Sequence, residues 1–392
     1  MISREYVGSV TKTLRSEIEC EIHNRGPIPF SRYMEMCLYD PELGYYSRHA
    51  DQFGKAGDFY TSSDVHAVFG RLMARQFEEM WRVLGRPARI VIRELGPGRG
   101  LFARDVLDWS EKKFPEFFSM LNYEFVESSP ALQVRIEENL KRHIDTGRAQ
   151  LTSAACSTNE RDATSAPEVP FIVFANEFFD ALPVEIVSNR GSLRIDTHDG
   201  HFIETWASSS PEELEFLDRY SIHPESDERI EVPLQSLAQM RAAANFERGF
   251  IVAIDYGYTR EEQLAGRHRG TLKAIRKHSV SANPYEAPGE QDITADVNFT
   301  ALAAIAEQQG MTVQKVITQA QFLMGIGEAS QFADAFEDCR LPQERAKVAL
   351  QLKHLVTPAG MGESFHVLVA SKGIEEEGVG SLAGLSFGRT TR

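Results

Sequence analysis

Cysteine is scarce in this chain. Its 392 residues include four, Cys20, Cys37, Cys156 and Cys339, and no two of them form a C-x-x-C pair. This excludes a disulfide-stapled fold and argues against a zinc site, so we expect reduced thiols and no bound metal. No apolar run reaches the length of a membrane span. The first 20 residues lack the apolar segment of a signal peptide, and their glutamates disfavour mitochondrial targeting, so the sequence predicts a cytoplasmic location.

Positive charge is also in deficit. The chain has 42 Lys and Arg against 57 Asp and Glu, which gives a formal net charge of −15. Such a balance disfavours binding to nucleic acid or to an anionic membrane surface. The hydrophobic fraction of 42% and the charged fraction of 25% are ordinary for a globular protein. The length allows one elaborated domain or two smaller ones.

The most informative motif lies at residues 90–100. An apolar run ends in an acid, three glycines follow at alternate positions, and a helical pattern begins at once. Strand, glycine turn and helix bring the backbone close to a nucleotide-like ligand. The spacing is E-x-G-x-G-x-G, not the G-x-G-x-x-G of dinucleotide sites, and it is typical of S-adenosylmethionine (SAM) methyltransferases. The alternative is an ordinary glycine-rich turn. The candidate cofactor-binding residues here are Glu94, Gly96, Pro97, Gly98 and Gly100.

The rest of the chain alternates short apolar runs with helical patterns. This alternation indicates an α/β fold with a mostly parallel sheet and helices on both faces. The seven predicted strands lie at residues 89–94, 122–127, 148–152, 170–175, 249–254, 311–317 and 365–371.

Two stretches interrupt this rhythm. Residues 184–206 alternate like a hairpin around Asp199-Gly200 and are followed by helical segments to residue 248, and residues 319–356 read as a helical insertion. Helical patterns also occupy residues 3–24 and part of 29–49. We therefore predict a helical N-terminal cover (1–85), a core (86–372) with insertions at about 184–248 and 319–356, and a disordered tail (373–392).

Glu127 follows the second predicted strand and is a candidate ribose-binding acid. A carboxylate at that strand end can accept hydrogen bonds from both ribose hydroxyls. The alternative is a surface glutamate that precedes a helix, because Ser128-Ser129-Pro130 looks like a helix start.

Three polar side chains follow the fourth predicted strand: Asn176, Glu177 and Asp180. Ligands of open α/β sheets bind beyond the carboxyl ends of the strands, so we expect these residues where the acceptor meets the methyl group. Two carboxylates and an amide can orient a guanidinium or an amine. The alternative is that Asp180 caps a helix and Glu177 faces solvent. Residues 57–63, an aromatic and hydroxyl-rich loop, could fold over the cofactor.

In this order, these segments resemble the MidA family of SAM-dependent methyltransferases. The similarity extends from about residue 27 to 370. The stretches that carry it are residues 27–30, 39–46, 57–62, 94–100, 126–130, 176–183, 255–257, 270–272, 288–294 and 355–362.

The resemblance implies a class I methyltransferase core, Rossmann-like and seven-stranded, with a helical N-terminal cover and inserted segments. It implies SAM as cofactor, bound by the glycine loop and Glu127. It also places Asp58 and Thr61 near cofactor or acceptor and makes a homodimer plausible. The chain departs from the family where Ser63-Asp64 replaces the usual Pro-Glu.

The acceptor does not follow from the resemblance. The mitochondrial member methylates an arginine of a complex I subunit, and a fungal relative is thought to methylate a small carboxylic acid. Our leading hypothesis is a protein arginine acceptor. The alternatives are O-methylation of a small carboxylate, with Arg99 or Lys55 to hold it, and an assembly factor that binds SAM without essential catalysis.

Overall fold

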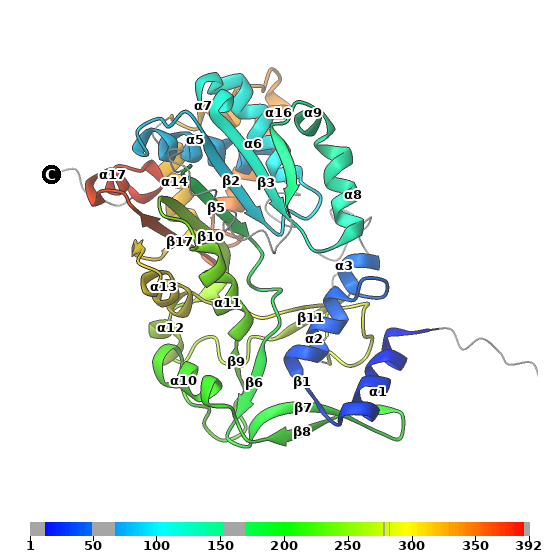
Figure 1. Ribbon diagram of the computed structural model, residues 1–392. Helices are drawn as coiled ribbons and strands as arrows, with labels where there is room; N and C mark the ends of the chain where they lie inside the picture. Colours follow the sequence, from blue (N-terminus) through cyan, green and yellow to red (C-terminus); the bar gives the residue numbers. More distant parts are fainter. Residues whose placement is uncertain are drawn as a thin grey trace, which may run out of the picture.

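A twisted sheet forms the centre of the protein (Figure 1). The computed structural model describes residues 12–48, 67–152, 169–276, 279–281, 283–328 and 330–387. Within them the main path of this sheet has the order β15-β17-β10-β5-β2-β3-β4. Off this path, β14 (Val297–Asn298) pairs with β10 and β16 (Ile317–Thr318) pairs with β17. The seven strands of the path are β2 (Ile90–Leu95), β3 (Leu121–Val126), β4 (Ala149–Thr152), β5 (Phe171–Asn176), β10 (Gly249–Tyr258), β15 (Thr312–Val313) and β17 (Phe365–Lys372).

The central strands are apolar at consecutive positions because both faces of the sheet are covered. On β5, Ile172 and Phe174 belong to one hydrophobic core, whereas Val173 and Ala175 belong to another. Side chains alternate between the two faces of a strand, so such a strand needs apolar residues at every position. Strands β4, β3, β2, β5 and β10 pair in parallel, and β17 runs antiparallel to β10. The predicted α/β fold with a mostly parallel sheet is confirmed.

The order of the strands creates a switch point between β2 and β5. From β2 the chain adds β3 and then β4 on one side, and it returns to place β5 on the other side of β2. The connections that leave β2 and β5 therefore diverge at the carboxyl ends of these strands. Such a divergence opens a crevice where ligands of open α/β sheets bind.

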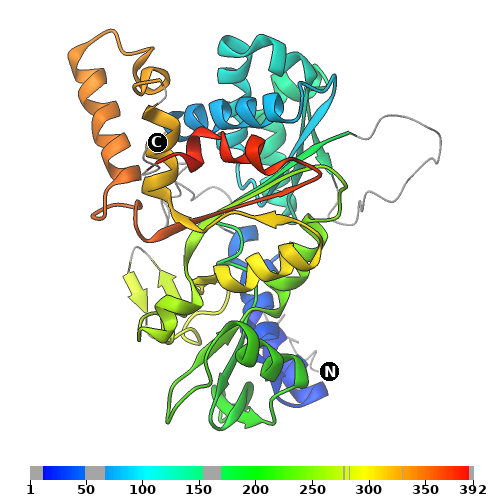
Figure 2. The ribbon, with the colours of Figure 1, turned by 90° about the vertical axis from the view of Figure 1, so that its left-hand side faces the viewer.

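Helices cover both faces of the sheet (Figure 2). The first core includes α5 and α6, and the second includes α10, α11 and α13. Although α5 falls within the segment predicted as an N-terminal cover, its apolar face is buried with α6. The helices named so far are α5 (Ala67–Val83), α6 (Leu101–Lys113), α10 (Pro211–Tyr220), α11 (Leu234–Ala243) and α13 (Phe299–Gln308). Others are α7 (Pro115–Met120), α8 (Pro130–Asn139), α9 (Lys141–Asp145) and α12 (Arg260–Leu264).

A second, antiparallel sheet lies below the first in Figure 1, with α1 and α2 against it. Its order is β1-β7-β6-β9, with β8 on β7. The predicted hairpin around Asp199-Gly200 is confirmed, because β7 and β8 pair across that turn. The elements of this lobe are α1 (Leu14–Arg25), β1 (Ile28–Pro29), α2 (Phe30–Tyr39), α3 (Tyr45–Arg48), β6 (Glu185–Ser188), β7 (Gly191–His198), β8 (His201–Ala207) and β9 (Ile230–Val232).

A third, small sheet was not predicted. It consists of β12, β11 and β13 in that order, all antiparallel. Its strands are β11 (Lys273–Arg276), β12 (Ser279–Ser281) and β13 (Asp292–Thr294). β13 pairs with β11 across a connection that also contains β12, so only the folded chain brings these two strands together.

Two predictions about the C-terminal third need correction. The strand expected at residues 311–317 is divided into β15 and β16, which pair separately with β17. The disorder expected after Gly373 is wrong for residues up to 387, which include α17 (Glu376–Gly380) and a short 3-10 helix, Ala383–Leu385. Val379 and Leu382 are buried in the first core, and these few apolar contacts outweigh a composition rich in glycine and glutamate.

The helical segment expected at residues 319–356 is confirmed. It contains α14 (Gln319–Glu328), α15 (Ala333–Phe336) and α16 (Pro342–Val356). Along the part of the chain that the structure describes, no helix has the length and apolarity needed to cross a membrane.

Candidate functional site

A cavity lies at the carboxyl ends of β2, β3 and β5, where the strand order predicts a ligand. Its volume is about 250 Å³, whereas a single water needs roughly 10–15 Å³ by the same measure. It can therefore hold a small molecule. Eight of the eleven site residues predicted from the sequence line it: Glu94, Gly96, Pro97, Gly98, Glu127, Asn176, Glu177 and Asp180.

The glycine turn after β2 forms one wall of the cavity. Gly96 and Gly98 have φ values of 62° and 56°, which L side chains rarely adopt. A Cβ on Gly96 would lie 2.8 Å from Phe178, whereas a Cβ on Gly98 would meet nothing within 4 Å. Gly98 therefore leaves free space for a ligand to approach the backbone.

Gly100 has a different environment. It does not line the cavity, and with a φ of 72° it precedes the first residue of α6. A Cβ there would lie 2.7 Å from Cδ1 of Leu140. The third glycine thus lets α6 pack closely against the segment that follows α8.

Glu94 ends the apolar run of β2 and is buried. The hydroxyl of Tyr123 on β3 donates to Glu94 Oε2 at 2.8 Å. Burial raises the pKa of Glu94 to about 8, and the charge of Glu127 adds to this rise. A buried acid with a raised pKa is stabilised when a cation or a hydrogen-bond donor binds its charged form.

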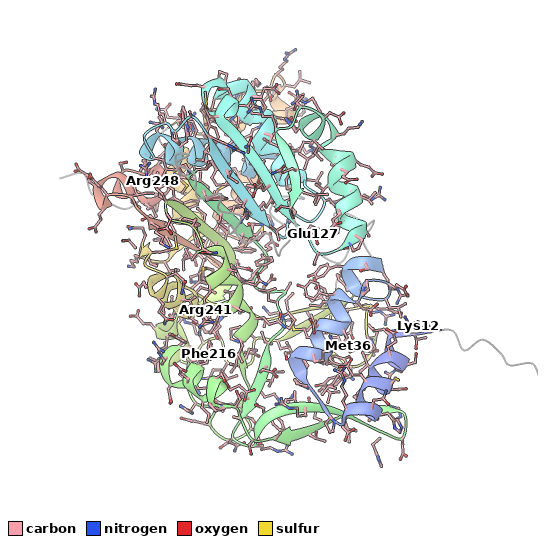
Figure 3. The ribbon with its side chains drawn as sticks, in the orientation of Figure 1. Lys12, Met36, Glu127, Phe216, Arg241 and Arg248 are labelled. Carbon is pink, nitrogen blue, oxygen red and sulfur yellow. The ribbon has the colours of Figure 1, made fainter. Side chains whose placement is uncertain are left out.

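Glu127 follows β3 and faces the space toward α3 (Figure 3). Its Oε1 accepts a hydrogen bond of 2.9 Å from the backbone N–H of Ser129. Ser129 is also the N-cap of α8, so Glu127 does precede a helix, as the alternative interpretation required, and it also lines the cavity. Burial raises the pKa of Glu127 to about 7.

The loop after β5 carries the acceptor candidates and is held by Asp255. The fully buried carboxylate of Asp255 accepts hydrogen bonds from the backbone N–H groups of Phe178, Phe179 and Asp180, at 3.1, 2.9 and 3.3 Å. Glu177, in the same loop, has a left-handed φ of 49°. Residues 255–257 are among the stretches that carry the resemblance, but no role was assigned to Asp255 from the sequence.

No helix follows Asp180, so it is not a helix cap. Asp180 is buried, and burial, together with the charges of Asp255 and Glu177, raises its pKa well above the ordinary value. Asn176 donates from Nδ2 to Glu177 Oε1 at 3.1 Å. The loop therefore places two carboxylates and an amide in one cavity wall.

Several cavity residues were missed from the sequence. Tyr39 ends α2, Tyr46 lies in α3 and Asp292 begins β13, so all three come from outside the central sheet. The signal available for them was the resemblance, which covers residues 39–46 and 288–294, but it gave them no role. Asp58 and Thr61 lie outside the described residues.

The cavity wall is strongly acidic. Among its described residues are five carboxylates and one cationic side chain, Arg99. Such a wall suits a ligand with positive charge, such as the sulfonium and ammonium groups of SAM. The open space at Gly98 and the acids Glu94 and Glu127, which lie at adjacent strand ends, suit the nucleoside part of SAM. Fold and cavity together define a Rossmann-like domain of the SAM-dependent methyltransferase class.

Comparisons with known proteins support the same class of protein. A family model described as S-adenosyl-L-methionine-dependent methyltransferase matches residues 72–317. A solved structure from Burkholderia thailandensis, bound to S-adenosyl-homocysteine, superposes with a TM-score of 0.79 at 27% identity, and the match covers 97% of this chain and 95% of that one. This chain belongs to the MidA family of SAM-dependent methyltransferases.

Curated relatives of the same family are named as arginine methyltransferases. The Drosophila melanogaster protein arginine methyltransferase NDUFAF7 homolog, mitochondrial, is 30% identical over 94% of this chain and 86% of its own length. The Danio rerio protein arginine methyltransferase NDUFAF7, mitochondrial, is 30% identical over 91% and 86%. These names contradict the cytoplasmic location predicted from the sequence. That prediction relied on the composition of the first 20 residues.

Proposed function

We propose that this protein transfers the methyl group of SAM to an arginine side chain of a protein. The observation that carries this proposal is the acidic wall of the cavity, where five carboxylates face one cation among the described residues. A guanidinium is a cation with five N–H donors and matches such a wall. The arginine methyltransferase names of relatives with 30% identity support the same acceptor.

In this proposal, one group of residues holds the cofactor. Glu127 accepts hydrogen bonds from the ribose hydroxyls, and Glu94 balances the charge of the amino group. Gly96, Pro97 and Gly98 let the backbone turn beneath the ligand, which the open space at Gly98 supports. Gly100 acts indirectly, through the packing of α6, and a place for Thr61 beside the cofactor stays a prediction.

Asn176, Glu177 and Asp180 orient the acceptor. SAM supplies an electrophilic methyl group when it is bound. As a guanidinium nitrogen gains this methyl group it loses one proton, and a nearby carboxylate must accept that proton. A raised pKa makes Asp180 the better base for this step. Asp58 stays a prediction for the same side of the site.

A small carboxylic acid is a poorer match. It would bring a further negative charge into a wall that already holds Glu94, Glu127, Glu177, Asp180 and Asp292. Like charges in a desolvated cavity repel strongly, and Arg99 alone cannot balance them.

The test is methyl transfer from labelled SAM into proteins of a cell lysate, followed by acid hydrolysis and separation of the amino acids. We expect label in methylarginine. Label confined to small molecules would refute the protein acceptor. If cellular function survives a Gly98→Val change that abolishes SAM binding, the protein acts as an assembly factor and not as an enzyme.

A further inference from the structure

Asp292 brings an additional carboxylate to the cavity from an element outside the central sheet. It lies on β13, is buried, and lines the same cavity as Asp180. A backbone hydrogen bond of 3.0 Å from Ala295 N to Asp180 O joins the two segments. The small sheet and the loop after β5 are therefore held in a fixed relation, with one acid on each side.

Two tyrosines from the N-terminal helices complete this part of the wall. The hydroxyl of Tyr46 donates to Asp292 Oδ1 at 3.2 Å, and the hydroxyl of Tyr39 donates to the carbonyl oxygen of Ala181 at 3.0 Å. Their ring centroids are 5.4 Å apart. Tyr46 thus fixes the carboxylate of Asp292, and the two neighbouring rings offer aromatic surface, which favours a cation.

Asn176 supplies an independent indication of the ligand. Its Oδ1 is buried and has no hydrogen-bond partner among the described residues, although its Nδ2 donates to Glu177. A buried acceptor without a donor is costly, and Asn176 lines the cavity. A ligand with N–H groups satisfies this oxygen, whereas a carboxylate does not.

We propose that Asp292 and Asp180 take the guanidinium of the methyl acceptor between them, and that Asp292, oriented by Tyr46, makes the cavity select arginine over lysine. This inference rests on the proposed function. A guanidinium is planar and can present N–H groups to carboxylates on two sides, whereas an ammonium is a compact point charge. Two buried acids that face one cavity are both ionised only when a cation lies between them.

The electrostatics of the cavity agree with this arrangement. Burial dominates the rise in the pKa of Asp180, and the charge of Asp292 contributes to it after those of Asp255 and Glu177. Burial also raises the pKa of Tyr46 well above its ordinary value, and Asp292 adds to that rise. Tyr46 therefore stays a hydrogen-bond donor to Asp292.

The experiment measures binding of N-acetyl-arginine amide, N-acetyl-lysine amide and butyrate to the protein saturated with S-adenosyl-homocysteine. Calorimetry compares the wild type with Asp292→Asn and with Glu290→Gln. Glu290 lies two residues earlier, forms an ion pair with Arg276 and does not line the cavity, so it controls for local disturbance.

We expect the wild type to prefer the arginine probe. Asp292→Asn should weaken binding of this probe at least about tenfold, because it removes one charge of a buried pair. Binding of S-adenosyl-homocysteine should stay within about twofold, and Glu290→Gln should change neither affinity. Tyr46→Phe, which keeps the aromatic ring, should also weaken binding of the arginine probe. This second variant tests the inference if Asp292→Asn does not fold.

Equal affinity of wild type and Asp292→Asn for the arginine probe would overturn the inference. So would no binding of this probe to the wild type, a preference for butyrate or the lysine probe, or a parallel loss of S-adenosyl-homocysteine affinity. If Asp292-dependent binding of the arginine probe is found but no protein is methylated, the guanidinium site between Asp292 and Asp180 is supported and the protein acceptor fails.

Discussion

The acids proposed to hold the cofactor make its binding depend on pH. Burial raises the pKa of Glu127 to about 7 and that of Glu94 to about 8, and both side chains line the cavity. In the proposed roles each must be ionised, either to accept two hydroxyl hydrogen bonds or to balance an ammonium. Binding then releases the protons that these acids hold in the free protein, so affinity rises with pH.

The size of the effect follows from the two pKa values. At pH 6, loss of the proton costs about tenfold in affinity at Glu127 and about a hundredfold at Glu94, since each pKa unit is a factor of ten. At pH 8 both costs fall to about twofold or less. The dissociation constant should therefore be several hundred times larger at pH 6 than at pH 8.

S-adenosyl-homocysteine is a suitable probe, because it has no methyl group to transfer and its sulfur does not titrate, so these two acids are the main source of the pH dependence. Calorimetry in two buffers of different ionisation enthalpy should detect release of nearly two protons at pH 6. In Glu94→Gln the dissociation constant should still be about tenfold larger at pH 6 than at pH 8, and this remaining difference comes from Glu127.

The stability of the free protein supplies a control of opposite sign. A raised pKa means that these acids contribute stability that is fully present below their ordinary pKa of 4.5 and is lost as pH rises from there to about 7 to 8. The unfolding temperature without ligand should therefore fall over this range. An affinity that is independent of pH, with no proton release, would refute the assignment of both carboxylates.

Three further predictions concern the glycine turn and the loop after β5. Gly98→Val should abolish SAM binding, whereas Gly147→Val should preserve it, because Gly147 has a φ of 70° and equally open surroundings but lies away from the cavity. Both changes should cost about 1–3 kcal/mol of stability. Equal loss of binding in a calorimetric comparison would contradict the steric argument. Asp180→Asn should reduce turnover at least about a hundredfold with SAM affinity retained, and near-normal turnover in a labelled-methyl assay would remove Asp180 as the base. Asp255→Asn should lower kcat about tenfold or more with little change in cofactor affinity. All three loop N–H groups donate to one oxygen, Oδ2, and a neutral amide oxygen accepts them more weakly, while the amide N–H₂ cannot accept the bond that Oδ1 takes from the backbone N–H of Tyr256. A change confined to KM or to unfolding temperature would argue for another role.

The sheet could be predicted because its strands are buried on both faces. Such strands appear in the sequence as short apolar runs, and six of the seven predicted ones are found as single strands. The run at 311–317 was harder, because β15 and β16 are two residues each and depend on β17 for their hydrogen bonds. The buried contacts of Val379 in α17 were likewise invisible in a segment of such composition.

The cofactor side of the site could also be predicted, since it is local. Glu94, Gly96 and Gly98 lie within five residues of one another, and the turn that they form needs glycine for its left-handed backbone. Glu127 follows from the rule that parallel strands end at one edge of the sheet. The roles of these residues stay predictions until binding is measured.

The sequence alone therefore determined the class of fold, the strand ends that carry chemistry and the cofactor, because each depends on residues close together in the chain. Only the tertiary structure decided that Tyr46 and Asp292, 246 positions apart, share a hydrogen bond in the cavity. It also decided that Asp255 serves as the anchor of the loop after β5. The physical reason is that such contacts arise from the packing of elements far apart in the chain, and no local pattern of residues encodes which distant side chains will meet.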